Sequence, residues 1–295
     1  MNTELDFGKF HITFLDNLKA LNDGGTHFGP VPKAVWNRKF PVDNNNQIPQ
    51  VIDPILLQYK GQNILIDTGL GTSKMNKKAM RNAGISEEAK LIDSLGEIDI
   101  KPEDIDIVIM THMHNDHAGG LTTLVDSEIK STFPEAKIYI NNIEWDEVRN
   151  PNKRTAGTYL KDNWEPIQDQ VKTWKESFEV NDAISLHHTG GHSNGHSIVL
   201  IKQDNDELIL MGDLMLTIAH RNPLWVSAFD DYPMDSIAAK EKWLTYAFKN
   251  ECRFIFYHEP FYAMVQFDKE GKEIINSVKR KKEPLVPYSD IFMLS

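Results

Sequence analysis

The sequence predicts an α/β fold built as an αββα sandwich, in which two sheets lie between two layers of helices. Short apolar segments of strand length recur along the chain and alternate with segments whose apolar residues have helical spacing. Four times along the chain, an apolar segment leads into a histidine or aspartate at its end or shortly after it. A length of 295 residues provides the core for one large domain or for two small ones, and the organisation of the segments favours a single domain over residues 1–295. A layered sandwich of this kind places such strand ends at one rim.

The apolar segments are interpreted as strands because they are short and bounded by polar or turn residues. They comprise residues 10–15, 52–59, 63–67, 105–111, 137–140, 183–188, 197–201, 207–212 and 253–258. Segments with helical spacing comprise residues 87–95, 142–149 and 236–248. The turn at 60–62 is expected to join two strands as a hairpin. The tract 150–180 carries Trp164, Trp174 and Phe178 among many charges. We expect it to form a helical insertion that packs over the functional site or against a second copy in a homodimer.

The most informative segment is THMHNDHAGG at 111–120, which directly follows a predicted strand. It places His112, His114, Asp116 and His117 within six positions. Burying such groups unpaired is costly, and a divalent metal removes that cost. His112 and His114 can point to the same side of an extended loop, whereas the other two lie beyond a turn. This arrangement favours two adjacent ions, typically about 3.5–4 Å apart, over one.

Three later segments offer the remaining ligands. His192 lies within HHTGGHSNGH at 187–196. Asp213 directly follows the predicted strand 207–212, and His258 ends the predicted strand 253–258. The carboxylate of Asp213 has two oxygens with which to bridge two cations. Other histidines of the 187–196 segment compete with His192, namely His187, His188 and His196. His196 precedes an apolar strand and is expected to hold the loop by hydrogen bonds instead.

The pattern HxHxDH at 112–117, followed by His192, Asp213 and His258, resembles the metallo-β-lactamase superfamily of binuclear hydrolases over nearly the whole chain. The resemblance implies the metallo-β-lactamase fold and a complete ligand set. One metal would be held by His112, His114 and His192, a second by Asp116, His117 and His258, with Asp213 bridging them. Asp67, in LIDTG at 65–69, would fix the site loop without touching a metal.

Two further segments, 22–36 and 212–233, resemble the quorum-quenching lactonases of the YtnP-like branch, which are relatives of N-acyl homoserine lactonases. The resemblance implies that the 22–36 loop, part of a substrate loop over 22–50, reaches over the metals. Apolar contacts to the substrate would then come from Phe28, Pro32 and Trp36. The best-known homoserine lactonases carry a tyrosine three residues after the bridging aspartate, whereas this chain has Leu216. Either another group, with His220 a candidate, takes that catalytic role, or the preferred substrate differs.

The reaction that the resemblance implies is the opening of a small lactone ring. A water that bridges two divalent ions becomes hydroxide near neutral pH, because a bound metal lowers its pKa to about 7. This hydroxide would attack the lactone carbonyl. Asp213 would hold the two ions. Asp116 would be either a metal ligand only or a ligand that also carries a proton to the ring oxygen. Nitrogen and oxygen ligands suit Zn²⁺, the expected metal, and also cobalt, manganese or iron.

Other functions are weaker alternatives. A thioesterase of the glyoxalase type or a phosphotriesterase of the same superfamily is the runner-up. A binuclear iron redox protein usually carries a fused flavin domain, for which 295 residues leave no room. A binding module without catalytic activity would lack some of the metal-ligand residues, whereas this chain has all seven.

Composition narrows the partners and the compartment. A net charge of −11 argues against a nucleic-acid partner, because nucleic-acid binders display a basic face. No segment has the apolar length of a signal peptide or a membrane span, which predicts a cytoplasmic protein without a membrane partner. The single cysteine, Cys252, excludes an intramolecular disulfide and a zinc site built on several thiolates, and it is expected to be buried.

Overall fold

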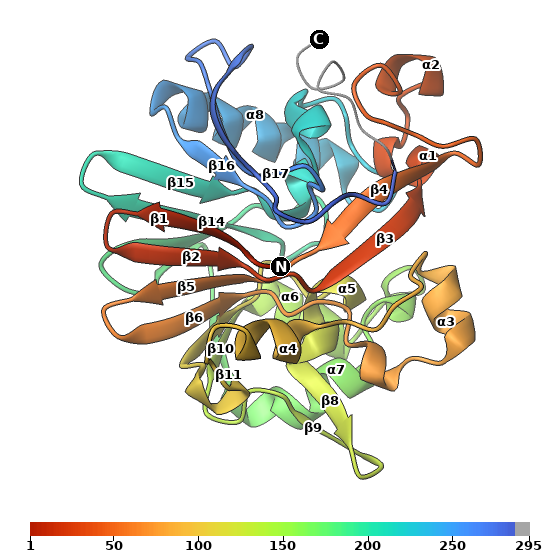
Figure 1. The fold of residues 1–295 in the computed structure, drawn as a ribbon, viewed down its shortest axis with the longest axis vertical. Coiled ribbons are helices and arrows are strands. Elements are labelled where there is room, and N and C mark those ends of the chain that lie inside the picture. Colours follow the sequence, from red (N-terminus) through yellow and green to blue (C-terminus); the bar gives the residue numbers. More distant parts are fainter. Residues whose placement is uncertain (287–295) are drawn as a thin grey trace. The chain divides into compact units, whose positions relative to one another are not determined.

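The computed structural model describes residues 1–286. Two compact units divide the chain: Met1–Leu18 with Ile52–Ser177, and Lys19–Val51 with the described residues from Phe178 on. Each unit has its own seven-stranded sheet, its own helices and its own buried core (Figure 1). The predicted α/β class with two sheets and helices is therefore confirmed.

The first unit is built on a sheet with the strand order β1-β2-β5-β6-β7-β10-β11. These strands are β1 (Thr3–Phe7), β2 (Phe10–Phe14), β5 (Ile55–Tyr59), β6 (Gln62–Ile66), β7 (Ile107–Ile109), β10 (Lys137–Asn141) and β11 (Val171–Trp174). A two-stranded sheet consists of β8 (Thr122–Val125) and β9 (Glu128–Ser131). The helices are α3 (Lys77–Asn82), α4 (Leu91–Gly96), α5 (Asn115–Ala118), α6 (Asn142–Arg149) and α7 (Lys161–Trp164).

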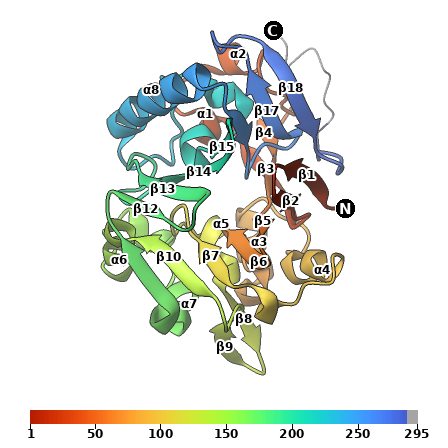
Figure 2. The same cartoon turned by 90° about the vertical axis from the view of Figure 1, so that its left-hand side faces the viewer.

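Parallel pairing in this sheet determines where the functional loop lies. β7 pairs in parallel with both β6 and β10, so the carboxyl ends of the three strands share one edge. Asp67 follows β6, and the HxHxDH segment follows β7. β5 and β6 form the predicted hairpin. Buried apolar side chains of α4, α6 and α7 belong to the same core cluster as those of β7 and β10, and Figure 2 shows these helices beside the sheet.

The second unit is built on a sheet with the order β12-β13-β14-β15-β16-β17-β18. Its strands are β12 (Ser177–Glu179), β13 (Ile184–His188), β14 (Ser197–Gln203), β15 (Asp206–Leu210), β16 (Arg253–Ile255), β17 (Tyr262–Phe267) and β18 (Ile274–Lys279). A two-stranded sheet consists of β3 (Leu18–Asp23) and β4 (Gln47–Ile52). The helices are α1 (Gly24–Phe28), α2 (Lys33–Trp36) and α8 (Pro233–Lys249).

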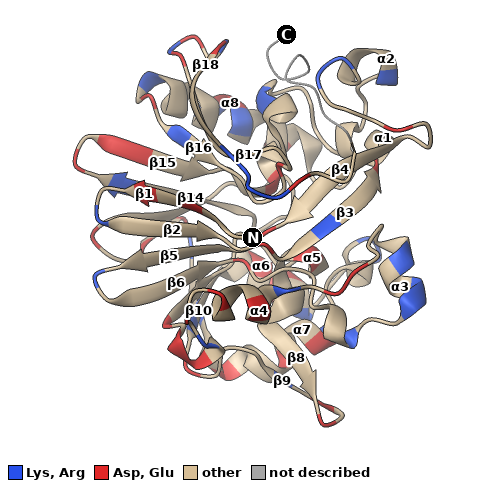
Figure 3. Ribbon diagram, in the orientation of Figure 1, with Lys and Arg blue, Asp and Glu red and all other residues tan. Residues whose placement is uncertain are grey.

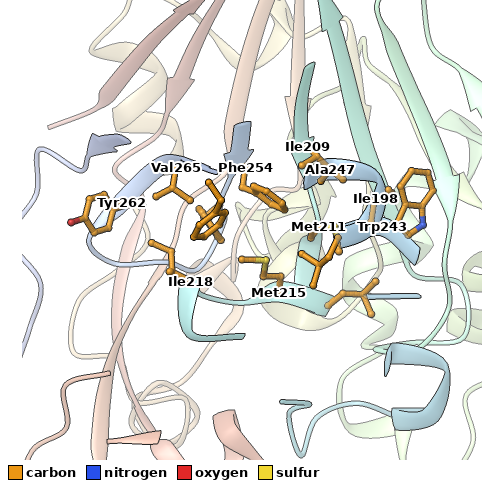
Figure 4. Close-up of a cluster of buried hydrophobic side chains, with 14 of the residues drawn as sticks. Ile198, Ile209, Met211, Met215, Ile218, Trp243, Ala247, Phe254, Tyr262 and Val265 are labelled. Atoms are coloured by element: carbon orange, nitrogen blue, oxygen red, sulfur yellow. The ribbon is translucent and has the colours of Figure 1, made fainter. Parts of the chain in front are cut away.

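Helix α8 supplies one side of the second core. It begins with proline in its first turn, where the missing N–H costs nothing. Its Trp243 and Ala247 lie in one buried cluster with Ile198 of β14, Ile209 of β15 and Phe254 of β16 (Figure 4). Cys252, directly before β16, is buried in the same cluster, as predicted. This packing holds the ends of β15 and β16, from which two of the predicted ligands extend.

The tract 150–180 differs from the predicted helical insertion. After α7 and a short 3-10 helix it becomes extended, because β11 pairs in parallel with β10 at the edge of the first sheet. Trp164 and Trp174 are buried within the chain. The aromatic residues among many charges suggested a helical insertion, but the residues from 171 to 174 form an edge strand in which Trp174 is buried.

Charged residues lie mainly on helices, in loops and near strand ends, while most strands carry few of them (Figure 3). Helix α3 carries a local group of basic residues. Within residues 1–286, no helix combines the length and the apolar character needed to cross a membrane.

Candidate metal centre

The HxHxDH segment of the first unit gathers imidazole and carboxylate groups in one buried loop. His112 and His117 are fully buried, and His114 is 9% exposed. The ring of His112 lies with its centroid 4.6 Å from that of His114 and 4.1 Å from that of His117. The Oδ2 atom of Asp116 is 3.9 Å from Nε2 of His117. All four side chains belong to groups of histidines and acids that could hold a metal ion.

Asp67 fixes this loop by hydrogen bonds to Thr111 and His117. Its carboxylate accepts hydrogen bonds from the backbone N–H of Thr111 at 2.8 Å, from the Thr111 hydroxyl at 2.7 Å and from Nδ1 of His117 at 2.8 Å. The residue has a φ of 53°, a left-handed conformation that aspartate tolerates better than most residues. Because Nδ1 of His117 donates to Asp67, its Nε2 is the nitrogen left to face a cation.

Glu144 of α6 supports the same loop from another side. Its Oε1 accepts from the backbone N–H of Met113 at 2.7 Å and from the Tyr159 hydroxyl at 2.8 Å. The Tyr159 ring lies 5.6 Å from the ring of His114. The backbone N–H of Asn115 donates to the hydroxyl of Thr158 at 3.0 Å. Part of the tract 150–180 therefore orders the histidine loop of its own unit.

The second unit contributes one aspartate between two histidines. Oδ2 of Asp213 lies 3.3 Å from Nε2 of His192, and Oδ1 of the same carboxylate lies 3.3 Å from Nε2 of His258. All three residues are at least 94% buried. Each carboxylate oxygen thus faces a different imidazole nitrogen, which is the arrangement expected of a carboxylate shared by two cations.

The two histidines are oriented by groups on their far sides. Nδ1 of His192 donates to Oδ1 of Asp230 at 2.9 Å, and the same oxygen accepts from the Ser227 hydroxyl at 2.8 Å. Burial acts to raise the pKa of Asp230, but the hydrogen bonds from His192 and Ser227 lower it overall. Nδ1 of His258 donates to the carbonyl oxygen of Val51 at 2.8 Å. Both rings therefore present Nε2 toward Asp213.

The loop that carries His192 packs tightly on the start of α8. Gly191 has a φ of 92°, and a Cβ there would lie 2.6–2.8 Å from atoms of Ser236. Its carbonyl accepts from the backbone N–H of Tyr232 at 2.9 Å. His196, as predicted, holds the loop: Nδ1 lies 2.8 Å from the Thr189 hydroxyl, and Nε2 accepts from the backbone N–H of Asp213 at 3.2 Å.

His220 is engaged within the second unit on both ring nitrogens. Nδ1 lies 2.9 Å from the Thr217 hydroxyl, and Nε2 donates to the carbonyl of His27 at 2.9 Å. The ring stacks on Phe28 at 4.8 Å, and burial lowers the pKa of His220 to about 4. These contacts give His220 a structural role in the second unit, and its catalytic role stays a prediction. Leu216, at the position of the lactonase tyrosine, is buried as well.

The 22–36 segment forms two short helices instead of an open loop. Phe28 is 0% exposed and Trp36 is 1% exposed, and their rings stack with centroids 4.7 Å apart. Only Pro32, before α2, is exposed among the three predicted substrate contacts. Phe28 and Trp36 therefore build the core of the second unit, and their predicted contact with a substrate remains untested.

Sequence reasoning missed three buried polar groups beside this site. Asp230 and Glu144 had no distinguishing spacing, since each is one acid among several in its segment. His27 lies inside the 22–36 segment, where only its glycines and aromatic residues drew attention. Glu144 and Asp230 are recognised only in the folded chain, because their partners Met113 and His192 lie 31 and 38 residues away in the sequence.

Comparison with known proteins assigns the chain to a family. The model of the metallo-β-lactamase superfamily matches residues 49–257, which include the HxHxDH segment, His192 and Asp213 and end one residue before His258. An N-acyl homoserine lactonase from Bacillus sp. is 27% identical over 172 residues, which cover 55% of this chain and 61% of the relative. The N-acyl homoserine lactonase AttM of Rhizobium radiobacter is 22% identical over 247 residues, covering 79% of this chain and 90% of the relative.

Solved structures agree with the family. A probable metal-dependent hydrolase from Staphylococcus aureus is 37% identical, with a TM-score of 0.90 and coverage of 95% of this chain and 100% of its own. AidC, a dizinc quorum-quenching lactonase, has a TM-score of 0.77 at 20% identity, covering 90% of this chain and 93% of its own, and this likeness shows the fold alone. The family model spans more than half of the chain, so the chain belongs to the metallo-β-lactamase superfamily.

Proposed function

We propose that this chain is a metal-dependent hydrolase that opens the ring of N-acyl homoserine lactones and so acts in quorum quenching. The observation that carries this proposal is the position of the Asp213 carboxylate. Each of its two oxygens lies 3.3 Å from Nε2 of a different histidine. Membership of the superfamily and the names of the curated relatives support the reaction class.

The side chains fit divalent metal ions in their chemistry. Four of the histidines have Nδ1 within hydrogen-bonding distance of one oxygen atom. The pairs are His112 with Thr111, His117 with Asp67, His192 with Asp230, and His258 with Val51. An imidazole held in this way keeps its Nε2 lone pair for a cation. Imidazole and carboxylate ligands without a thiolate suit Zn²⁺ and its neighbours in the first transition series.

We assign the ligands as the family pattern implies. One ion would be held by His112, His114 and His192, and a second by Asp116, His117 and His258, and Asp213 would be the ligand common to both. Two divalent ions, when bound, supply an activated water and an electrophile for the carbonyl oxygen.

The protein's own groups position the reaction. In lactone opening, water adds to the carbonyl carbon, the bond from that carbon to the ring oxygen breaks, and the ring oxygen takes a proton to become the hydroxyl of the product. Asp116 is suited to carry this proton, because its side chain is 33% exposed while that of Asp213 is only 5% exposed. Asp67 and Asp230 keep the histidines oriented throughout.

A substrate panel tests the proposal. The purified protein is stripped of metal, reconstituted with Zn²⁺, Co²⁺ or Mn²⁺, and assayed with N-butanoyl, N-hexanoyl and N-decanoyl homoserine lactones, aryl thioesters and aryl phosphotriesters. We expect kcat/KM to be highest for the lactones and to vanish without metal. A preference for thioesters or phosphotriesters would replace lactone opening by one of those reactions and leave the metal assignment standing.

A matched pair of aspartate variants separates the site from the surface. Asp213→Ala should abolish turnover, because the shared ligand is lost. Asp206→Ala should leave turnover unchanged, since Asp206 is 62% exposed and pairs with Arg253. Equal activity of both variants would remove Asp213 from the site.

A further inference from the structure

His27 is a buried imidazole that differs from the other buried histidines of the second unit. Its side chain is 1% exposed, and neither Nδ1 nor Nε2 has a hydrogen-bond partner among residues 1–286. His192, His220 and His258 each place Nδ1 within hydrogen-bonding distance of a neighbour. A buried polar group without a partner disfavours folding, so such a group in a native protein calls for an explanation.

The backbone around His27 is held on both sides. Asp23 caps α1 by accepting from the backbone N–H of Thr26 at 3.0 Å, and the carbonyl of Thr26 accepts from the N–H of Ala228 at 2.8 Å. The carbonyl of His27 itself accepts from Nε2 of His220 at 2.9 Å. Its imidazole is therefore attached to a fixed frame, as a group that must meet a ligand in one geometry requires.

The segment 228–230 joins the backbone beside His27 to a candidate ligand of its own unit, because Ala228 donates its N–H to the carbonyl of Thr26 and Asp230 accepts from Nδ1 of His192. The other nitrogen of that ring faces Asp213. Burial is the main cause that lowers the pKa of His27 to about 3, so its ring is neutral near neutral pH. A neutral imidazole carries one N–H donor and one bare nitrogen acceptor.

Exposed apolar side chains lie in the segment that contacts the His27 ring. The ring of Phe229 meets that of His27 edge-on, with centroids 5.6 Å apart, and Phe229 is 45% exposed. The same segment exposes other large apolar side chains, namely Leu224, Tyr232 and Met234. A hydrogen-bonding group beneath an exposed apolar segment suits a ligand with a polar head and an apolar tail.

We propose that His27 is a catalytic residue that donates its ring N–H to the carbonyl oxygen of a substrate bound beside Asp213 and His258, while Phe229 contacts the substrate's apolar part. The inference rests on the proposed function and names a contact for it. His27 forms a hydrogen bond only and exchanges no proton. The bond counts most as the carbonyl oxygen gains negative charge, and a single donor of this kind typically contributes about 100–1,000-fold to kcat.

The central test uses variants that separate the donor from the volume of the ring. His27→Phe removes both nitrogens and keeps an aromatic ring, whereas His27→Gln keeps an N–H donor. His187→Phe, at a half-buried histidine that lines a separate cavity of about 440 Å³, is the matched control. Each metal-loaded variant is measured for kcat and KM with N-hexanoyl homoserine lactone, for metal content and for thermal midpoint.

We expect His27→Phe to lower kcat about 100-fold with metal content unchanged, and His27→Gln to recover part of that loss. The thermal midpoint of His27→Phe should equal or exceed that of the wild type, because an unsatisfied buried polar group has been removed. If the role of His27 were purely structural, the thermal midpoint of His27→Phe would be lower than that of the wild type. A kcat within twofold of the wild type, or a loss that follows loss of metal or of folding, would overturn the proposal.

Binding gives a readout that does not need turnover. Calorimetry with the ring-opened product N-hexanoyl homoserine should show weaker binding to His27→Phe than to the wild type and to His187→Phe. A wild type that opens no lactone but shows this difference would refute the proposed function and keep His27 as a contact. Equal binding by all three proteins, or no binding by the wild type, would refute the contact itself.

Discussion

Nδ1 of His192 lies 2.9 Å from Oδ1 of Asp230, an acid 38 residues further along the chain. Both side chains are buried, and the hydrogen bond fixes which imidazole nitrogen faces Asp213. A carboxylate behind a ligating histidine also raises the basicity of the ring. This relationship gives the first prediction.

Asp230→Asn should weaken metal binding without removing a ligand. The amide oxygen can still accept from His192, but the negative charge is gone, and we expect the affinity for zinc to fall about 10–100-fold. Competition with a chromophoric chelator measures this. Asp235→Asn, at an exposed acid in the first turn of α8, is the control and should bind zinc as the wild type does. Unchanged affinity in Asp230→Asn would show that the hydrogen bond does not tune the metal.

Gly191→Ala should displace the loop that carries His192. The new methyl group would meet Ser236 at 2.6–2.8 Å, and the backbone there has a φ of 92°. Gly61→Ala is the matched control, because its φ is 77° but nothing lies within 4 Å of its Cβ. We expect the control to cost about 1–2 kcal/mol in unfolding free energy, from backbone strain alone, with full metal content. Gly191→Ala should cost more and bind less metal, and equal behaviour of the two variants would contradict this packing.

His27→Phe should change how stability depends on pH. Burial lowers the pKa of His27 to about 3, below its ordinary value of 6.5, so between these values the unfolded chain binds the proton and the folded chain does not. The stability of the wild type therefore falls as pH falls through this window, and the phenylalanine variant lacks that contribution. Denaturant unfolding at pH 7 and pH 5 should show the variant gaining about 1–2 kcal/mol on the wild type at the lower pH. A pH-independent difference would mean that His27 titrates normally in the folded protein.

Phe229→Ala should flatten the dependence of kcat/KM on acyl-chain length. Each buried methylene contributes about 0.8 kcal/mol, so longer chains gain affinity until the apolar contact is covered. Phe229 is 45% exposed and next to His27. Val35→Ala, at a residue of α2 with 46% exposure, is the control and should keep the wild-type trend. The same steep trend in both variants would place the acyl chain elsewhere.

The sequence contains stronger signals for the candidate metal ligands than for the segments around them. The HxHxDH spacing and the strand ends before Asp213 and His258 identify candidate ligands, because metal ligation constrains residue type and spacing together. Phe28 and Trp36 show the limit of the same reasoning. An aromatic residue in a glycine-rich segment has the same pattern whether it faces solvent or a core, and only the fold decides that these two stack at 0% and 1% exposure.

Strand β11 and His27 show two other limits. Val171–Trp174 becomes a strand because β10 offers it a parallel edge, and this is a tertiary cause with no local signal. His27 is informative only because it has no hydrogen-bond partner in the described part of the chain, a property that its neighbours in sequence do not reveal.

The most direct test of the account is the metal content of the reconstituted protein. Elemental analysis after dialysis against excess Zn²⁺ should give about two ions per wild-type chain, because seven ligands exceed what one tetrahedral ion uses. Asp213→Ala, whose lost carboxylate has each oxygen 3.3 Å from a histidine nitrogen, should bind less than the wild type and lose turnover. One ion or fewer in the wild type, or full metal and full turnover in Asp213→Ala, would contradict the binuclear site.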